Sequence, residues 1–326
     1  MRVFAPFLLF ISLAAGTLLI AQVPATDPAA NVVLTAAREA LGGDKKLSAV
    51  KTIVATGRTR QVRGENLVPI EFEIALELPD KYVRKDEIPA QESEPTTVGF
   101  NGEELIQFPI PTLPTTAMPQ RAGGPPAPTA ASLDAARKTR LVNVKQDFAR
   151  LTLGMFAGSF PTFPLTFSYV AKAEAPQGKA DVLEVKGPAN FTARLFVNAE
   201  THLPVMVTWT PPPPPQRGSG APPSSRGTPP ASAGQPPPPA ATPPASAGQR
   251  PPPGSAPAAT GRGPGAGPPS PPPESRIYYA DYRDVNGMQF PFRLRRAVGA
   301  DTVEETTFDG FKINVKIDPK KFEVRK

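Results

Sequence analysis

The chain has 326 residues, of which 46 are proline, one is histidine and none is cysteine. The lack of cysteine excludes a disulfide scaffold, a thiolate metal site and a cysteine nucleophile. Of the prolines, 25 lie within residues 211–273, a segment that also holds four arginines and no acidic residue. More than half of the formal net charge of +7 therefore comes from this segment. The remainder shows no basic face, so the charge does not indicate a nucleic-acid-binding protein.

The first 22 residues have the pattern of a secretory signal peptide. Met1 and Arg2 form a short basic start, and an apolar run of 15 residues follows at Phe7–Ala21. Small residues after this run offer cleavage sites. A helix that spans a bilayer needs about 20 apolar residues, more than the run contains. We therefore expect residues 1–22 to be removed on export, a periplasmic location, and no stable transmembrane span in the mature protein.

The rest of the chain is predicted to form a single domain from residues 27–210 and 276–326. Residues 109–131 form a loop rich in Pro, Ala and Thr. Residues 211–273 have the composition of a disordered or polyproline-II segment. Because long loop insertions cost little conformational free energy, we expect this segment to be an insertion within one hairpin and not a linker between domains.

Two segments have helical patterns. A capping aspartate and a proline at residues 27–28 precede an Ala-rich stretch that ends at a pair of glycines. A longer helix is predicted over Leu133–Phe156, with Ser132 as its N-terminal cap. Its apolar residues recur every three or four positions and mark one face, from which Lys145 and Arg150 point away. This apolar face contains Leu141, Val144, Phe148, Leu151 and Met155.

Most other segments alternate apolar and polar residues, the pattern of an antiparallel strand with one buried face. Asn-Gly pairs at 101–102 and 286–287 predict tight hairpin turns. Strands are predicted at 67–78, 82–88, 96–100, 104–108, 166–175, 181–186, 191–197, 203–210, 276–284, 288–298, 303–308 and 312–317.

These elements predict an α+β fold that is mostly antiparallel β. A sheet of about ten or eleven short strands twists and curls, which predicts an unclosed, strongly curved, barrel-like sheet. Its concave apolar face must be covered, and the two helices are the available covers. If they cover the face incompletely, an apolar cleft remains. If they fill the hollow, the same apolar residues are simply core.

The sequence lacks the residues of most catalytic sites. His202 is the only histidine, and it falls in a turn between two predicted strands. Glu103–Glu104 and Glu304–Glu305 are adjacent pairs in predicted strands, so the two carboxylates of each pair point to opposite faces. No nucleophile elbow or phosphate loop occurs in a suitable context. We therefore expect a protein that is not an enzyme and that uses no metal or cofactor.

Five segments combine turns and alternating strands in a recognisable order: LGGDKKLSAVKTIVATG, VGFNGEELIQF, FVNAETHLPVMVTW, YYADYRDVNGMQFPFRLRR and EETTFDGFKINVKIDPKKFEV. In order and spacing they resemble the periplasmic outer-membrane lipoprotein-sorting carrier superfamily (LolA/LolB-like), of which the chain looks like a divergent member. Gly102 and Leu105 match the family's DG-x-x-L hairpin, with Asn101 in place of Asp. Asn198–Pro204 matches its D-x-x-T-x-L-P hairpin, again with Asn for Asp.

The resemblance implies an unclosed antiparallel barrel with a helical lid that holds lipoprotein acyl chains. It also implies a strand arginine that locks the lid, for which Arg58, Arg60 and Arg63 are the candidates. The predicted lipid-binding residues on the long helix and the following aromatic loop are Leu141, Val144, Phe148, Leu151, Met155, Phe160 and Phe163, with Ile74, Leu76 and Trp209 on the opposite wall.

The predicted function is that of a soluble periplasmic carrier. It would bind lipid or lipoprotein acyl chains in the concave face of the sheet and aid outer-membrane lipoprotein sorting. The alternative is a non-catalytic envelope sensor or protein-binding module of the same fold. Such a module would contact an envelope protein partner through an edge strand or through residues 211–273.

Overall fold

The computed structural model describes residues 27–64, 66–89, 91, 93–111, 129–175, 178–211 and 273–324. The expected signal peptide and nearly all of the Pro-rich segment lie outside the described residues, as do residues 112–128 of the predicted loop.

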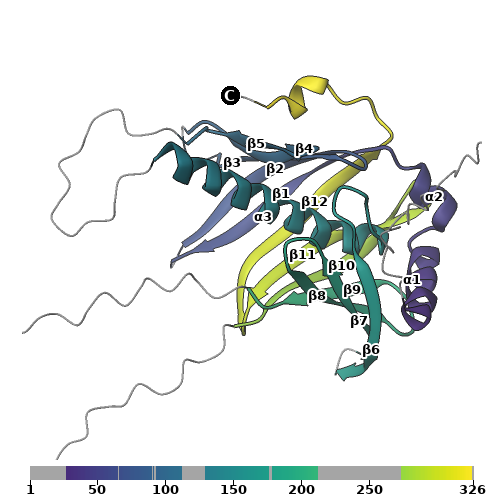
Figure 1. The fold of residues 1–326 in the computed structure, drawn as a ribbon. Coiled ribbons are helices and arrows are strands. Elements are labelled where there is room, and N and C mark those ends of the chain that lie inside the picture. The colour runs from purple at the N-terminus through teal and green to yellow at the C-terminus, as the bar shows by residue number, and fades with distance from the viewer. Residues whose placement is uncertain are drawn as a thin grey trace, which may run out of the picture. The chain divides into compact units, whose positions relative to one another are not determined.

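Twelve antiparallel strands form one sheet, in the order β5-β4-β3-β2-β1-β12-β11-β10-β9-β8-β7-β6 (Figure 1). Within the described residues, β5 and β6 are the two edges and do not pair with each other, so the sheet is unclosed. The antiparallel α+β fold is therefore confirmed, with slightly more strands than predicted. The strands are β1 (Thr52–Arg63), β2 (Asn66–Glu77), β3 (Lys81–Glu87), β4 (Thr96–Asn101), β5 (Glu104–Phe108), β6 (Thr166–Ala175), β7 (Gly178–Gly187), β8 (Phe191–Asn198), β9 (Pro204–Trp209), β10 (Ser275–Val285), β11 (Met288–Val298) and β12 (Asp301–Ile313).

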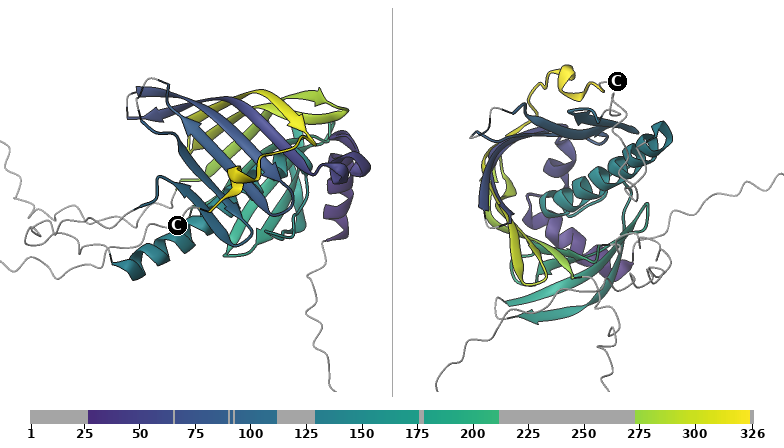
Figure 2. Two further views of the ribbon diagram at one scale, coloured as in Figure 1. Left: turned by 90° about the horizontal axis from the view of Figure 1, so that it is seen from above. Right: turned by 90° about the vertical axis from the view of Figure 1, so that its left-hand side faces the viewer.

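The sheet curves around the long helix α3 (Ala130–Phe156), as Figure 2 shows. In the sequence, α3 connects the edge strand β5 to the edge strand β6. On the concave side of the sheet it contacts β4, β5, β9 and β11. The helix therefore covers the hollow that the unclosed sheet leaves open, as the strand pattern predicts.

Two further helices, α1 (Pro28–Ala40) and the unpredicted short helix α2 (Asp44–Ala49), lie beside one end of the strands (Figure 1). Asp27 caps α1 as predicted, because its Oδ1 accepts a hydrogen bond from the amide of Ala29 at 3.0 Å. Its Oδ2 accepts a second bond, from the amide of Tyr169 in β6, at 2.9 Å. One carboxylate thus caps a helix and satisfies part of an open sheet edge.

The start of α3 differs from the prediction. Thr129, and not Ser132, is the capping residue. Its Oγ1 accepts from the amide of Ser132 at 3.2 Å, and the Ser132 hydroxyl accepts from the amide of Thr129 at 2.8 Å. These reciprocal bonds satisfy two amides at once, which favours the earlier start at Ala130. The helix ends at Phe156, as predicted.

Two differences from the predicted strand ranges offset each other. The continuous strand β12 replaces two predicted strands, and the sequence pattern misses β1 altogether. The inward positions of β1 include Ala55, Gly57 and Thr59, so its alternation in hydrophobicity is weak. A Cβ at Gly57 would lie 2.3 Å from the carbonyl oxygen of Thr307 in β12, beside a bulge in the pairing. Glycine is needed there because the two backbones approach closely.

The strands on either side of the Pro-rich segment are neighbours. Trp209 of β9 pairs with Ser275 of β10, so the predicted pairing of these two strands is confirmed. The next turn, between β10 and β11, has Asn286 and Gly287 at φ values of 58° and 76°. A tight hairpin turn of this kind needs positive φ at both residues, as the Asn-Gly signal predicts.

Candidate functional site

Side chains on the concave face become more polar with distance from α1 and α2. Three adjacent strands share this gradient, read from the helix end: Ile53, Ala55, Gly57, Thr59 and Gln61 in β1; Phe311, Phe308, Thr306 and Glu304 in β12; and Phe290, Phe292, Leu294 and Arg296 in β11. The register aligns the polar positions, because Glu304 pairs with Gln61 on one side and with Arg296 on the other. The hollow is therefore apolar at one end and polar at the other.

A cavity of about 860 Å³ lies at the polar end of the hollow. Its size falls in the range of roughly 300–1,000 Å³ that is usual for small-molecule sites. Strands on both sides of β1 and one face of α3 form its walls. Exposed side chains at its rim, including Arg63, Glu94 and Arg140, give it access to solvent. Its apolar wall includes Ile70, Ile74, Val98, Val144, Leu151 and Leu294.

Three of the predicted lipid-binding residues line this cavity: Ile74, Val144 and Leu151. The other seven pack in the core or against it: Leu76, Leu141, Phe148, Met155, Phe160, Phe163 and Trp209. The helices thus fill the apolar end of the hollow and leave the polar end open. A role of these residues in binding lipid stays a prediction.

Phe148 shows how the apolar end is filled. Its side chain is only 1% exposed. Its ring centroid lies 5.3 Å from that of Phe100, 5.8 Å from that of Tyr82 and 5.8 Å from that of Phe160. Aromatic pairs at these separations add favourable contacts beyond the burial of their area. This cluster joins α3, β3, β4 and the loop after α3 into one packed unit.

Two tyrosines of β10 hold the C-terminal half of α3 against the sheet. The hydroxyl of Tyr279 donates to the carbonyl oxygen of Arg150 at 2.5 Å, and that of Tyr282 donates to the carbonyl oxygen of Gly154 at 2.9 Å. Gly154 lets the helix come this close, since a Cβ there would lie 2.3 Å from the Tyr279 ring. No sequence pattern marks Gly154, Tyr279 or Tyr282, because a glycine inside a helix and isolated tyrosines in a strand carry no pattern of their own.

A polar network crosses the cavity wall from β3 to β12. Arg84 donates from Nε to Oδ1 of Asp86 at 2.7 Å and from a terminal nitrogen to the Thr59 hydroxyl at 3.2 Å. The hydroxyls of Thr59 and Thr306 are 2.8 Å apart. Thr306 also donates to a carboxylate oxygen of Glu304 at 3.3 Å. Polar groups of three strands, β3, β1 and β12, are thus linked in this part of the hollow.

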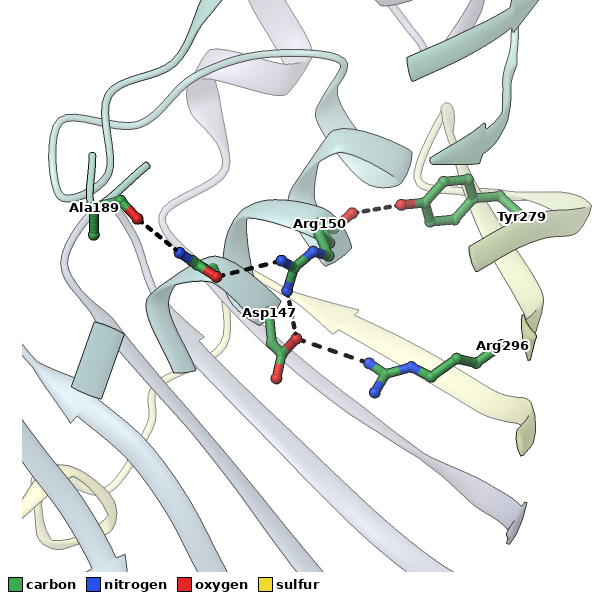
Figure 3. A network of polar contacts seen from close by, with 6 residues as sticks. Asp147, Arg150, Ala189, Tyr279 and Arg296 are labelled. Atoms are coloured by element: carbon green, nitrogen blue, oxygen red, sulfur yellow. Dashed lines mark hydrogen bonds and ion pairs between the residues drawn. The ribbon is translucent and has the colours of Figure 1, made fainter. Parts of the chain in front are cut away.

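A second network connects α3 to β11 across the same cavity (Figure 3). Asp147 accepts a hydrogen bond from Arg150 at 2.9 Å and lies 3.9 Å from a guanidinium nitrogen of Arg296. Arg150 also donates to the side-chain oxygen of Gln146 at 3.3 Å. Asp147 and Arg296 line the cavity, whereas Arg150 is buried behind them.

The position of Lys145 and Arg150 off the apolar face of α3 suggests that they point into solvent. In the structure both side chains are buried instead. They are 6% and 7% exposed, because the sheet curves around more than one face of α3. Lys145 donates to a carboxylate oxygen of Glu103 at 2.6 Å. The guanidinium of Arg150 lies over the rings of Trp209 and Phe191, at 4.3 and 5.2 Å from their centroids. Burial lowers the pKa of Arg150 and Asp147 opposes this effect, and an arginine remains charged throughout.

The strand arginine that contacts α3 is Arg296 of β11, and not one of the three candidates in β1. Arg58 lies on the convex face beside Glu71, 3.6 Å from its carboxylate, and Arg60 is exposed. Arg63 is exposed at the rim of the cavity. The sequence could not identify Arg296 because only the curvature of the sheet brings β11 opposite α3.

Burial raises the pKa of Tyr82, Tyr279 and Tyr282 well above the usual value for tyrosine, and nearby arginines only partly offset this at Tyr82 and Tyr279. The unfolded chain releases these protons near pH 10, before the folded chain does. Stability is therefore fully present below about pH 10 and is expected to fall as the pH rises above it. Unfolding temperatures measured from neutral to alkaline pH, alongside absorbance at the tyrosinate band, check this expectation.

A matched variant tests whether a single buried tyrosine contributes to the loss of stability at alkaline pH. Tyr279→Phe removes one of these phenols, so its alkaline loss of stability should be smaller than that of the native protein. An identical pH dependence in the two proteins would contradict the role of Tyr279.

No group of three or more His, Asp or Glu side chains among the described residues could hold a metal ion. No helix in the described ranges combines the length and the apolar character needed to cross a membrane. The Glu304 and Glu305 side chains point to opposite faces as predicted, since Glu304 faces the cavity whereas Glu305 lies 3.8 Å from Arg293 on the other side. Glu103 does not lie in a strand, because β5 begins at Glu104 and Glu103 belongs to the turn before it.

Comparisons with known proteins gave structural matches only. No protein-family model matches the sequence, and no curated protein matches it. A LolA superfamily protein from Nitrosomonas europaea superposes with a TM-score of 0.44 at 13% identity, over 90% of this chain and 97% of that one. A putative outer membrane lipoprotein-sorting protein domain from Vibrio parahaemolyticus gives 0.42 at 8% identity, over 90% and 97%. A DUF1329 family protein from Desulfovibrio piger gives 0.38 at 6% identity, over 91% and 98%.

The chain is similar to LolA superfamily proteins.

Proposed function

We propose that this protein is a non-catalytic carrier that holds an acyl chain of a lipid or lipoprotein in the cavity between α3 and the sheet. The observation that carries the proposal is a cavity of about 860 Å³ at the polar end of an otherwise apolar hollow. The lining of this cavity combines an apolar wall with charged side chains, which suits an amphiphile, whose chain and polar head need different surroundings. Each methylene group removed from water contributes roughly 0.8 kcal/mol, so binding requires a shielded apolar wall and no reactive group.

The cellular setting follows from the sequence. The signal-peptide pattern of residues 1–22 supports export, which would place the carrier in the periplasm. The hairpin motifs at Gly102 and at Asn198–Pro204 resemble those of lipoprotein-sorting carriers. Lipoproteins of the outer membrane are therefore the cargo that we propose.

A variant that fills the cavity tests the proposal. Leu151 is half-buried and lines the cavity, so Leu151→Trp should occupy room that a bound chain needs. Displacing two methylene groups back into water costs roughly 1.6 kcal/mol, which corresponds to an affinity about tenfold weaker. Titration with a fluorescent fatty-acyl probe, and mass spectrometry of lipid extracted from protein purified from the periplasm, measure the effect.

Leu67→Trp is the control, because Leu67 is 65% exposed near the tip of the β1–β2 hairpin, away from the cavity lining. Its affinity for the probe should equal that of the native protein. Native protein that binds no acyl probe and carries no lipid from the periplasm would refute the carrier function.

A further inference from the structure

Three cationic and three anionic side chains at the cavity wall balance one another. Arg84, Arg296, Asp86, Asp147 and Glu304 line the cavity, Arg150 is buried beside Asp147, and we call these six residues the charged belt. Arg84 is held by Asp86 at 2.7 Å and Arg150 by Asp147 at 2.9 Å. Arg296 lies opposite Glu304 in the β11–β12 register, and its guanidinium lies 3.9 Å from the carboxylate of Asp147. Three cations and three anions give the belt a formal charge of zero.

The other charged groups of the lining are exposed. Arg63, Glu94 and Arg140 stand at the rim in contact with solvent, where water and salt screen their charges. Five members of the charged belt are buried or half-buried, where screening is weaker, whereas Asp147 is exposed. The charged belt therefore sets the electrostatic preference of the cavity.

Two members of the charged belt have side-chain donors or acceptors that make no hydrogen bond to other described residues. The Arg296 side chain makes no hydrogen bond to another described residue, and its nearest carboxylate, that of Asp147, is already bound more closely by Arg150. Glu304 accepts one bond, from Thr306 at 3.3 Å, through one of its two oxygens. Arg296 and Glu304 are partners in the β11–β12 register, so unused N–H donors and an unused acceptor lie side by side.

We propose that the cavity selects amphiphiles whose polar group is uncharged and both donates and accepts hydrogen bonds, such as an amide or a hydroxyl next to the acyl chain. This inference rests on the proposed carrier function. An amide carbonyl or hydroxyl oxygen accepts from Arg296, and its N–H or O–H donates to Glu304. An ionised head would instead place an uncompensated charge beside a balanced belt, which opposes binding.

Three probes with the same chain length test this selectivity. They are N-dodecanoyl ethanolamine, which is neutral, dodecyl phosphate, which is anionic, and dodecylamine, which is cationic. Each is titrated below its micelle concentration, at physiological salt, against a bound fluorescent acyl probe. The native protein should bind the neutral compound about tenfold more tightly than either charged one, a ratio that corresponds to about 1.4 kcal/mol.

Two variants shift the charge of the belt in opposite directions. Glu304→Gln leaves one positive charge in excess, so the relative affinity for dodecyl phosphate should rise about tenfold. Arg296→Gln leaves one negative charge in excess, so the relative affinity for dodecylamine should rise by a similar factor. Glu305→Gln and Arg295→Gln are the matched controls, because these neighbours point to the other face, where Glu305 lies near Arg293 and Arg295 lies over Tyr278. Neither control should change the order of the three probes.

The outcomes separate this inference from the function on which it rests. Equal binding of the three probes, or an order that both belt variants leave unchanged, would overturn the selectivity and leave the carrier function standing. Failure of every probe to bind would refute both. Opposite shifts in the two belt variants, with no shift in the controls, would support the inference.

Discussion

Replacing Phe148 by alanine is expected to lower the free energy of unfolding by about 3–5 kcal/mol, the usual cost of truncating a buried phenylalanine. Phe148 is 1% exposed and its ring packs against those of Tyr82, Phe100 and Phe160. The truncation leaves a void between α3, two strands and the following loop, which cannot all collapse together. Urea unfolding followed by circular dichroism measures the change.

The control is Lys138→Ala, a truncation in the exposed N-terminal part of the same helix. It should change the free energy of unfolding by no more than about 0.5 kcal/mol. A Phe148→Ala variant that is as stable as this control would mean that α3 does not pack into the sheet as described.

Replacing Gly154 by alanine is expected to destabilise the protein by about 2 kcal/mol. Alanine in a helix interior normally makes the folded state about 1 kcal/mol more stable than glycine does. At Gly154, however, the added Cβ would lie 2.3 Å from a ring carbon of Tyr279, far inside the distance of about 3.5–4.0 Å for ordinary carbon contacts. The ring cannot turn aside without losing the bond from its hydroxyl to Arg150. Overpacking of this kind costs about 1–3 kcal/mol beyond the propensity gain.

Calorimetry measures this effect as a lower Tm, by about 4–8 °C for a domain of this size. Gly310→Ala is the control, since a Cβ at Gly310 meets no atom within 4 Å. It should leave the Tm nearly unchanged. A higher Tm in Gly154→Ala would show that helix propensity outweighs the contact, and that α3 does not lie so close to β10.

The predictable elements are those whose signal is local. The Asp27 cap, the Asn286–Gly287 turn and the alternation in β2 depend on a few consecutive residues, and all three are present. The start of α3 and the strand β1 were less predictable for opposite reasons. At the start of α3, Thr129 and Ser132 are both candidate caps, three positions apart. In β1, small and polar inward residues hide the alternation.

The candidate site was predictable only in its apolar part. Ile74, Val144 and Leu151 belong to strong periodic patterns, and all three line the cavity. The same periodicity also marks Leu76, Phe148 and Met155, which are packed core. A repeating pattern identifies the buried face of an element, but it does not reveal whether another side chain fills the space in front of it.

The amino-acid order by itself determined an antiparallel sheet with a covering helix, because alternating and helical spacings of apolar residues show which face of each element is buried. It also determined that the strands around the Pro-rich segment pair. Only the tertiary structure decided that the hollow is filled at its apolar end, and that Arg84, Asp147 and Arg296 meet at the other. These three residues come from β3, α3 and β11, and single charges on separate elements carry no periodic signal. The curvature of the sheet brings them together, and curvature is a property of all twelve strands at once.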